Sequence, residues 1–93
     1  VSFGNVTELH QYGRVLIAQR KPKEALDVFL LNAKKNPGTF TADMGLARGY
    51  SANGDFKNAL KYAKMAQPLA PDKPNKDGVA KMIEQLAAGK DVN

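Results

Sequence analysis

The 93-residue sequence contains no cysteine. This absence excludes disulfides and thiolate metal sites, and it fits a reducing compartment as well as an oxidising one. No apolar run approaches the roughly 18 residues that a membrane-spanning helix needs, and the first residues lack the pattern of a signal peptide. Because residue 1 is valine, we expect the chain to be a piece of a longer protein.

Motifs of catalysis are missing as well. The chain has no serine-nucleophile motif, no paired carboxylates typical of a catalytic cleft and no spacing typical of metal ligands. Gly45, Gly49 and Gly54 are scattered and do not form a phosphate-binding loop. His10 is the only histidine, and the sequence supplies no partners for a catalytic or metal-binding role. We therefore expect a protein that is not an enzyme and that needs no cofactor or metal.

The composition describes one small domain. Hydrophobic residues make up 43% of the chain and charged residues 25%, which is enough for a single core. The 14 basic and 9 acidic residues give a net charge of +5, spread along the chain rather than grouped in blocks. This charge favours anionic partners only weakly.

Apolar residues recur at helical spacing in five segments, which predicts an all-α fold. The first helix begins near Val6, after the cap candidate Asn5, and ends at the Arg20-Lys21-Pro22 stop. The second runs from about Pro22 to Lys35. Its predicted inner face consists of Ala25, Leu26, Phe29, Leu30 and Ala33.

The remaining helices follow from turn signals. Thr39 or Thr41 caps the third helix, Asp55 caps the fourth, and Pro68 ends the fourth. A polar connector at residues 72–76 then leads to a last helix over about 77–88, which Gly89 stops.

Residues 40–71 carry a family pattern of large, small, turn and terminating residues. The pattern consists of Leu46, Ala47, Tyr50, Gly54, Asp55, Phe56, Ala59, Ala63, Ala66 and Pro71. A shift of 34 residues also aligns the chain with itself, superimposing Thr7 on Thr41, Arg14 on Arg48, Ala18 on Ala52, Lys23 on Lys57, Ala25-Leu26 on Ala59-Leu60 and Pro37 on Pro71. In both features the chain resembles the tetratricopeptide repeat (TPR) family.

The resemblance implies a right-handed α-α superhelix of about five antiparallel helices. Repeat one covers about residues 6–37, repeat two about 40–71, and a capping helix about 77–88, all within a single domain of residues 1–93. Small residues then face each other where paired helices approach closely, Gly13 with Ala25 and Ala47 with Ala59. Larger residues are expected to fill the space between the pairs, namely Tyr12, Leu16, Phe29, Tyr50 and Phe56.

TPR proteins bind peptides or helices along the first helix of each pair, so the resemblance also implies a groove. Its exposed positions correspond to Thr7, His10, Gln11, Arg14 and Ile17, then Thr41, Met44, Gly45, Arg48 and Ala52, and finally Met82, Gln85 and Leu86. Arg14 and Arg48 stand side by side in this alignment, where they either hold an acidic group or simply solvate the face. The lysines and asparagines of the family's carboxylate clamp are missing, which argues against binding of chaperone tails.

Two alternatives to peptide binding stay open. The open end of the array, with Val6 and Phe3, could pack on a second copy as a homodimer or on an upstream domain. A stripe formed by Lys57, Lys61 and Lys64 could touch nucleic acid, although a solvated face is the simpler reading. The ending, residues 81–93, is similar to the ends of some exported bacterial proteins and favours a bacterial origin, in the cytoplasm or the periplasm.

Overall fold

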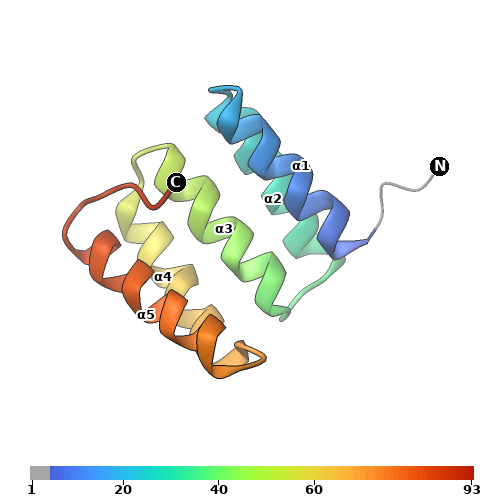
Figure 1. Cartoon of the computed structure of the whole chain (residues 1–93). Helices are drawn as coiled ribbons and strands as arrows, with labels where there is room; N and C mark the ends of the chain where they lie inside the picture. Colours follow the sequence, from blue (N-terminus) through green and yellow to red (C-terminus); the bar gives the residue numbers. More distant parts are fainter. Residues whose placement is uncertain (1–4) are drawn as a thin grey trace.

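Five α-helices make up the part of the chain that the structure describes, which is residues 5–93 of a computed structural model. They are α1 (Val6–Ala18), α2 (Pro22–Lys35), α3 (Phe40–Ala52), α4 (Phe56–Ala66) and α5 (Lys73–Ala87), and the short 3-10 helix η1 (Gln67–Leu69) follows α4. Helices α1, α3 and α5 lie in one layer, and α2 and α4 lie in a second layer behind them (Figure 1). The predicted all-α fold of five helices is therefore confirmed.

The helix boundaries repeat along the chain. Helix α3 begins 34 residues after α1, and α4 begins 34 residues after α2. The turns repeat too, because Arg20 has φ 62° between α1 and α2, and Gly54 has φ 76° at the equivalent place between α3 and α4. We call α1 with α2 hairpin one, and α3 with α4 hairpin two.

Side chains cap the helices at the predicted positions. The side-chain oxygens of Asn5, Thr39 and Asp55 each accept a hydrogen bond from the backbone amide three residues later, at 2.7, 3.3 and 3.2 Å. Each bond satisfies a backbone donor that has no partner inside its helix. Gly89, predicted to stop the last helix, has φ 73°, a conformation that favours glycine.

The start of α5 differs from the prediction. The sequence predicts a polar connector over residues 72–76, but α5 already begins at Lys73. The Asp72 carboxylate accepts a hydrogen bond from the amide three residues later at 2.9 Å, and Pro74 lies in the first turn, where a missing N–H costs nothing. The charge and proline content of this stretch therefore mark the beginning of a helix.

The core of the molecule is built around Phe29 of α2, which is fully buried. A Cβ atom added at Gly13, Gly45 or Gly49 would lie 2.4, 2.6 or 2.8 Å from the ring, closer than real Cβ contacts allow. These glycines therefore let α1 and α3 approach the ring. The Phe29 ring, predicted to fill the space between the hairpins, thus packs directly against Gly13.

A second cluster joins hairpin two to α5. Its buried members are Ala47, Ala59, Ala63, Met82 and Leu86. The rings of Tyr50 and Tyr62 stack with their centroids 5.7 Å apart and pack against both clusters. The two clusters therefore form a continuous core.

Two side chains contradict the predicted packing, and one buried polar side chain had no prediction. Tyr12, expected between the hairpins, is 53% exposed, and Leu30, expected on the inner face of α2, is 42% exposed. Asn32 is fully buried, where its Nδ2 donates to the Val6 carbonyl at 3.0 Å and its Oδ1 accepts from Asn36 at 2.9 Å. Periodicity identifies the faces of a helix, but only the neighbouring helices decide which of those faces is covered.

The open end of hairpin one is described in part. Val6 is partly buried, while Phe3, predicted beside it, lies outside the described residues. Across residues 5–93, no helix combines the length and the apolar character needed to cross a membrane.

Candidate functional site

The layer of α1, α3 and α5 carries two adjoining pockets of about 280 Å³ each, and Arg14 and Arg48 line both of them. The pocket near the helix starts is lined by Thr7, His10, Gln11, Arg14, Phe40, Thr41, Met44, Arg48 and Asn75. The pocket near the helix ends is lined by Arg14, Ile17, Ala18, Arg48, Val92 and Asn93. We call the two together the arginine groove.

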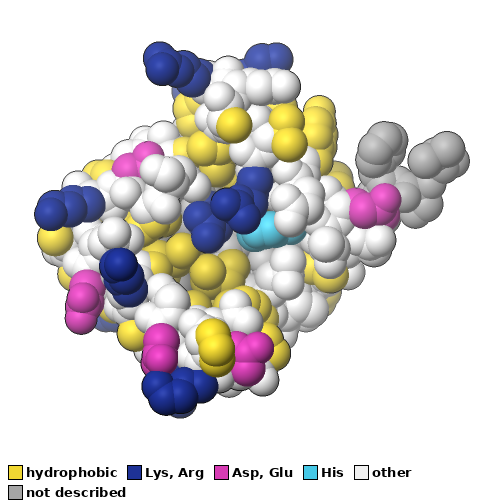
Figure 2. Space-filling model, viewed as in Figure 1, with side chains coloured by type: hydrophobic (Ala, Val, Ile, Leu, Met, Phe, Trp, Pro, Cys, Tyr) yellow, Lys and Arg dark blue, Asp and Glu magenta, His cyan; other side chains and the backbone are white. Residues whose placement is uncertain are grey.

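This face combines positive charge with apolar surface. Figure 2 shows Lys and Arg side chains meeting the histidine near its centre, with hydrophobic side chains around them. Seven of the thirteen predicted groove residues line one pocket, including both arginines, and Ile17 lines the other. Gly45 and Ala52 line neither pocket.

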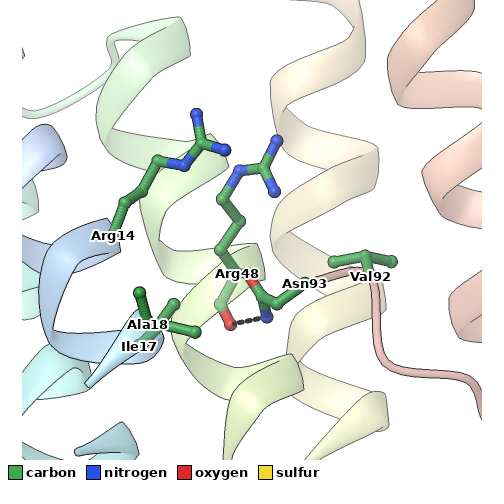
Figure 3. A pocket seen from close by; sticks show the side chains of 6 residues that line it. All are labelled: Arg14, Ile17, Ala18, Arg48, Val92 and Asn93. Carbon is green, nitrogen blue, oxygen red and sulfur yellow. Dashed lines mark hydrogen bonds between the residues drawn. The ribbon is translucent and has the colours of Figure 1, made fainter. Parts of the chain in front are cut away.

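Arg14 and Arg48 extend their guanidinium groups toward the same side of the groove (Figure 3). Arg14 is exposed and Arg48 is partly buried. Within residues 5–93 neither group has a carboxylate within 4.0 Å, and Nε of Arg48 is buried without a hydrogen-bond partner. Burial and then the charge of Arg14 lower the pKa of Arg48. Two neighbouring cations without a counterion favour the binding of an anion.

His10 lies beside the two arginines and is neutral at pH 7. Burial, followed by the charges of Arg48 and Arg14, lowers its pKa to about 4. The ring centroid lies 5.7 Å from that of Phe29, and Nδ1 is buried without a hydrogen-bond partner. No group of three or more potential metal ligands occurs among the described residues. The imidazole therefore adds a polar wall to the groove but no charge.

The last residues of the chain form a wall of the second pocket. The Ser51 hydroxyl donates to Oδ1 of Asp91 at 2.6 Å and accepts from the Val92 amide at 3.0 Å. Nδ2 of Asn93 donates to the Arg48 carbonyl at 2.9 Å (Figure 3). These bonds hold the tail against the end of α3.

The ionisation of Asp91 reflects the same contacts. Burial acts to raise its pKa, but the hydrogen bonds from Ser51 and Asn93 outweigh it and hold the pKa below the usual value. Because Ser51 is only 2% exposed, its hydroxyl depends on the tail for hydrogen-bond partners.

The groove residues predicted on the last helix do not line either pocket. Met82 is 6% exposed and belongs to the core cluster, as does Leu86. Gln85 is partly buried, and its carbonyl accepts hydrogen bonds from the turn that ends α5. Helix α5 packs mainly against α4 rather than α3, so its first turn, through Asn75, is the part that reaches the groove.

The sequence missed several lining residues. Ala18 lies four residues after Arg14, and helical spacing could have placed it on the same face. Phe40 and Asn75 depend on how the helix starts are arranged, and Val92 and Asn93 depend on the folded tail. No periodic pattern marks a tail of this kind.

The lysine stripe lies apart from the groove. Lys57, Lys61 and Lys64 are exposed on α4, which belongs to the other layer (Figure 1). The ammonium of Lys61 lies 5.4 Å from the centre of the partly buried Tyr62 ring. This contact engages Lys61 with the protein's own aromatic side chain.

No protein-family model, curated protein or solved structure matches the chain. The geometry of the described residues therefore carries the functional argument.

Proposed function

We propose that this chain is a TPR-type scaffold that binds an acidic peptide segment in the arginine groove and catalyses no reaction. The 34-residue offset of the helix boundaries supports this reading, because TPR units are helix-turn-helix repeats of that length. The finer architecture that we infer is a right-handed α-α superhelix of two repeats, with α5 as the cap.

The observation that carries the peptide-binding proposal is the unpaired arginine pair. Arg48 is partly desolvated beside Arg14, and within residues 5–93 neither has a carboxylate in ion-pair range. A carboxylate bound between them relieves their mutual repulsion and accepts charge-assisted hydrogen bonds. An acidic ligand would thus supply the negative charge that balances the two arginines.

The second pocket adds a preference for the neighbouring residue of the peptide. Ile17, Ala18 and Val92 line it next to the arginines. An aliphatic side chain that enters this pocket loses contact with water while the adjacent carboxylate binds the guanidinium groups. We therefore expect peptides with an Asp or Glu next to an aliphatic residue.

Selection from a random peptide display library tests the proposal. Peptides enriched on the wild-type protein should carry this acidic-aliphatic pair. In fluorescence anisotropy, Arg14→Ala or Arg48→Ala should weaken binding of an enriched peptide about 10-fold, which corresponds to the loss of a charge-assisted hydrogen bond.

Two controls separate the groove from general charge. Lys64→Ala removes an exposed cation on α4 and should leave the affinity unchanged. A peptide in which Asn or Gln replaces the acidic residue should bind wild type as weakly as the acidic peptide binds the arginine variants. Failure to enrich any peptide, or enrichment without acidic residues, contradicts the proposal.

A further inference from the structure

An apolar furrow of about 380 Å³ runs between α1 and α2 on the outer side of hairpin one. Leu9, Tyr12, Val28 and Leu31 line it. Tyr12 and Leu31 are 53% and 47% exposed, so large apolar side chains adjoin each other on a surface that faces water. Such a patch marks an interaction surface.

The furrow is independent of the arginine groove. No residue lines both, and on α1 the furrow residues Leu9 and Tyr12 lie on the side of the helix away from Arg14. Occupation of one site therefore leaves the other accessible.

Hairpin two shows how helices can cover residues at equivalent positions. Tyr12 corresponds to Leu46 in hairpin two, and Leu46 is 3% exposed because it packs into the cluster around Phe29 of hairpin one. Val28 corresponds to Tyr62, which packs against the same cluster. The position that is buried in hairpin two as Leu46 is thus exposed in hairpin one as Tyr12, whereas the position of Leu31 and Met65 is exposed in both units.

We propose that this face docks on the same face of a second copy of the chain, across a two-fold axis. Such an interface must be self-complementary, offering both the projection and the recess that receives it. Hairpin one offers a recess in the furrow and projecting side chains in Tyr12 and Leu31, which line the furrow and are 53% and 47% exposed. Val15, 48% exposed, stands where α3 has Gly49, so this face carries a knob that the covered face lacks.

The charges around the furrow also fit a second copy. Glu8, Glu24 and Lys35 are exposed, and each lies four residues from a lining residue. Because α1 and α2 are antiparallel, Glu8 and Lys35 lie at one end of the furrow and Glu24 at the other. A two-fold axis parallel to the helices brings Glu8 opposite Lys35 of the second copy. An axis across the helices brings Glu24 opposite Lys35 of the second copy, so opposite charges meet in either arrangement.

The small number of stacked units in one chain also favours a dimer. Helical repeats bury their apolar faces only against neighbours, and about three units are usually needed for a stable array. In a single chain, α5 covers hairpin two, but no helix among residues 5–93 covers the outer face of hairpin one. A dimer formed through hairpin one would be a stack of four hairpins with an α5 helix at each end.

Sedimentation equilibrium from micromolar to millimolar concentration tests the proposal. Wild type should show a monomer–dimer equilibrium, and Leu31→Lys should raise its dissociation constant about 100-fold, because each substitution occurs twice in a two-fold interface. Tyr12→Lys is a second variant with the same expected effect. Circular dichroism checks that both remain folded.

Met65→Lys is the matched control. Met65 is the counterpart of Leu31 in hairpin two and is equally exposed at 47%, but it does not line the furrow. Its substitution should leave the dissociation constant unchanged. A wild-type monomer at millimolar concentration overturns the proposal and leaves the furrow to another polypeptide. A dimer that survives Leu31→Lys and Tyr12→Lys, or an assembly that grows beyond two copies, overturns it as well.

Discussion

At the scale of single residues, glycine decides how closely the helices of this protein pack. Phe29 is fully buried because Gly13, Gly45 and Gly49 offer no Cβ to its ring. The sequence predicted Gly45 as an exposed groove position and showed Gly49 only as a scattered glycine, but both are buried. Their role depends on a ring from another helix, which no local pattern reveals.

The substitution Gly45→Ala should destabilise the protein by about 1–3 kcal/mol, because the new methyl group would lie 2.6 Å from the buried Phe29 ring. Gly78→Ala is its matched control, since Gly78 also lies inside a helix but has no atom within 4 Å of the added Cβ. That change should stabilise by up to about 1 kcal/mol through helix propensity. Urea denaturation measures both, and equal effects of the two substitutions would contradict this account of the core.

At the scale of helices and turns, the two hairpins solve the same geometric problem with different residues. Arg20 adopts the left-handed conformation that Gly54 adopts one repeat later. A non-glycine residue pays a steric cost there, whereas glycine does not. Hairpin one has Arg20-Lys21-Pro22 where hairpin two has Gly54-Asp55-Phe56, and the φ of Arg20 shows the consequence of that difference.

The substitution Arg20→Gly should therefore stabilise the protein by about 0.5–1 kcal/mol. This value is the relief of steric strain in the folded turn minus the entropic cost of ordering a glycine, which is more flexible in the unfolded chain. The reciprocal change Gly54→Arg should destabilise it by about 1 kcal/mol. Thermal unfolding followed by circular dichroism measures the two changes. Destabilisation by Arg20→Gly would mean that contacts of the arginine side chain outweigh the strain of the turn.

At the scale of the whole molecule, one histidine should dominate the dependence of stability on mildly acidic pH. Burial and the two arginines lower the pKa of His10 to about 4 in the folded state, from 6.5 in the unfolded chain. The unfolded chain therefore binds more protons between these values, so the free energy of unfolding must fall as the pH falls. Asp43, whose pKa is raised by burial, acts in the opposite direction at the acid end of this range.

We expect the free energy of unfolding to drop by about 1–2 kcal/mol between pH 6.5 and pH 4, after allowance for the partial exposure of the ring. The variant His10→Gln keeps a polar side chain but removes the titration, so it should lose most of this slope. Denaturant titrations at a series of pH values provide the comparison. Parallel pH profiles for wild type and variant would show that His10 is not responsible.

Local interactions that can be read from the sequence specify where the helices of this protein begin and end. Caps such as Asn5 and Asp55 and the glycine at position 89 act on their nearest backbone groups, so they mark helix ends without knowledge of the fold. The 34-residue alignment likewise predicted that Arg14 and Arg48 lie side by side, and both line the arginine groove. The predicted start of α5 was wrong, although the sequence carries the local signal for the correct one: Asp72 and Pro74 are residues typical of a helix start.

Which helix faces are covered depends on contacts between helices that lie far apart in the sequence. Tyr12 and Met82 have similar helical patterns around them, yet Tyr12 is exposed and Met82 is buried, because a neighbouring helix covers one and not the other. The docking of Val92 and Asn93 beside the arginines also arises from contacts far apart in the chain. Burial depends on which elements meet in space, whereas periodicity and capping reflect interactions within a few residues, and the sequence pattern reports only the latter.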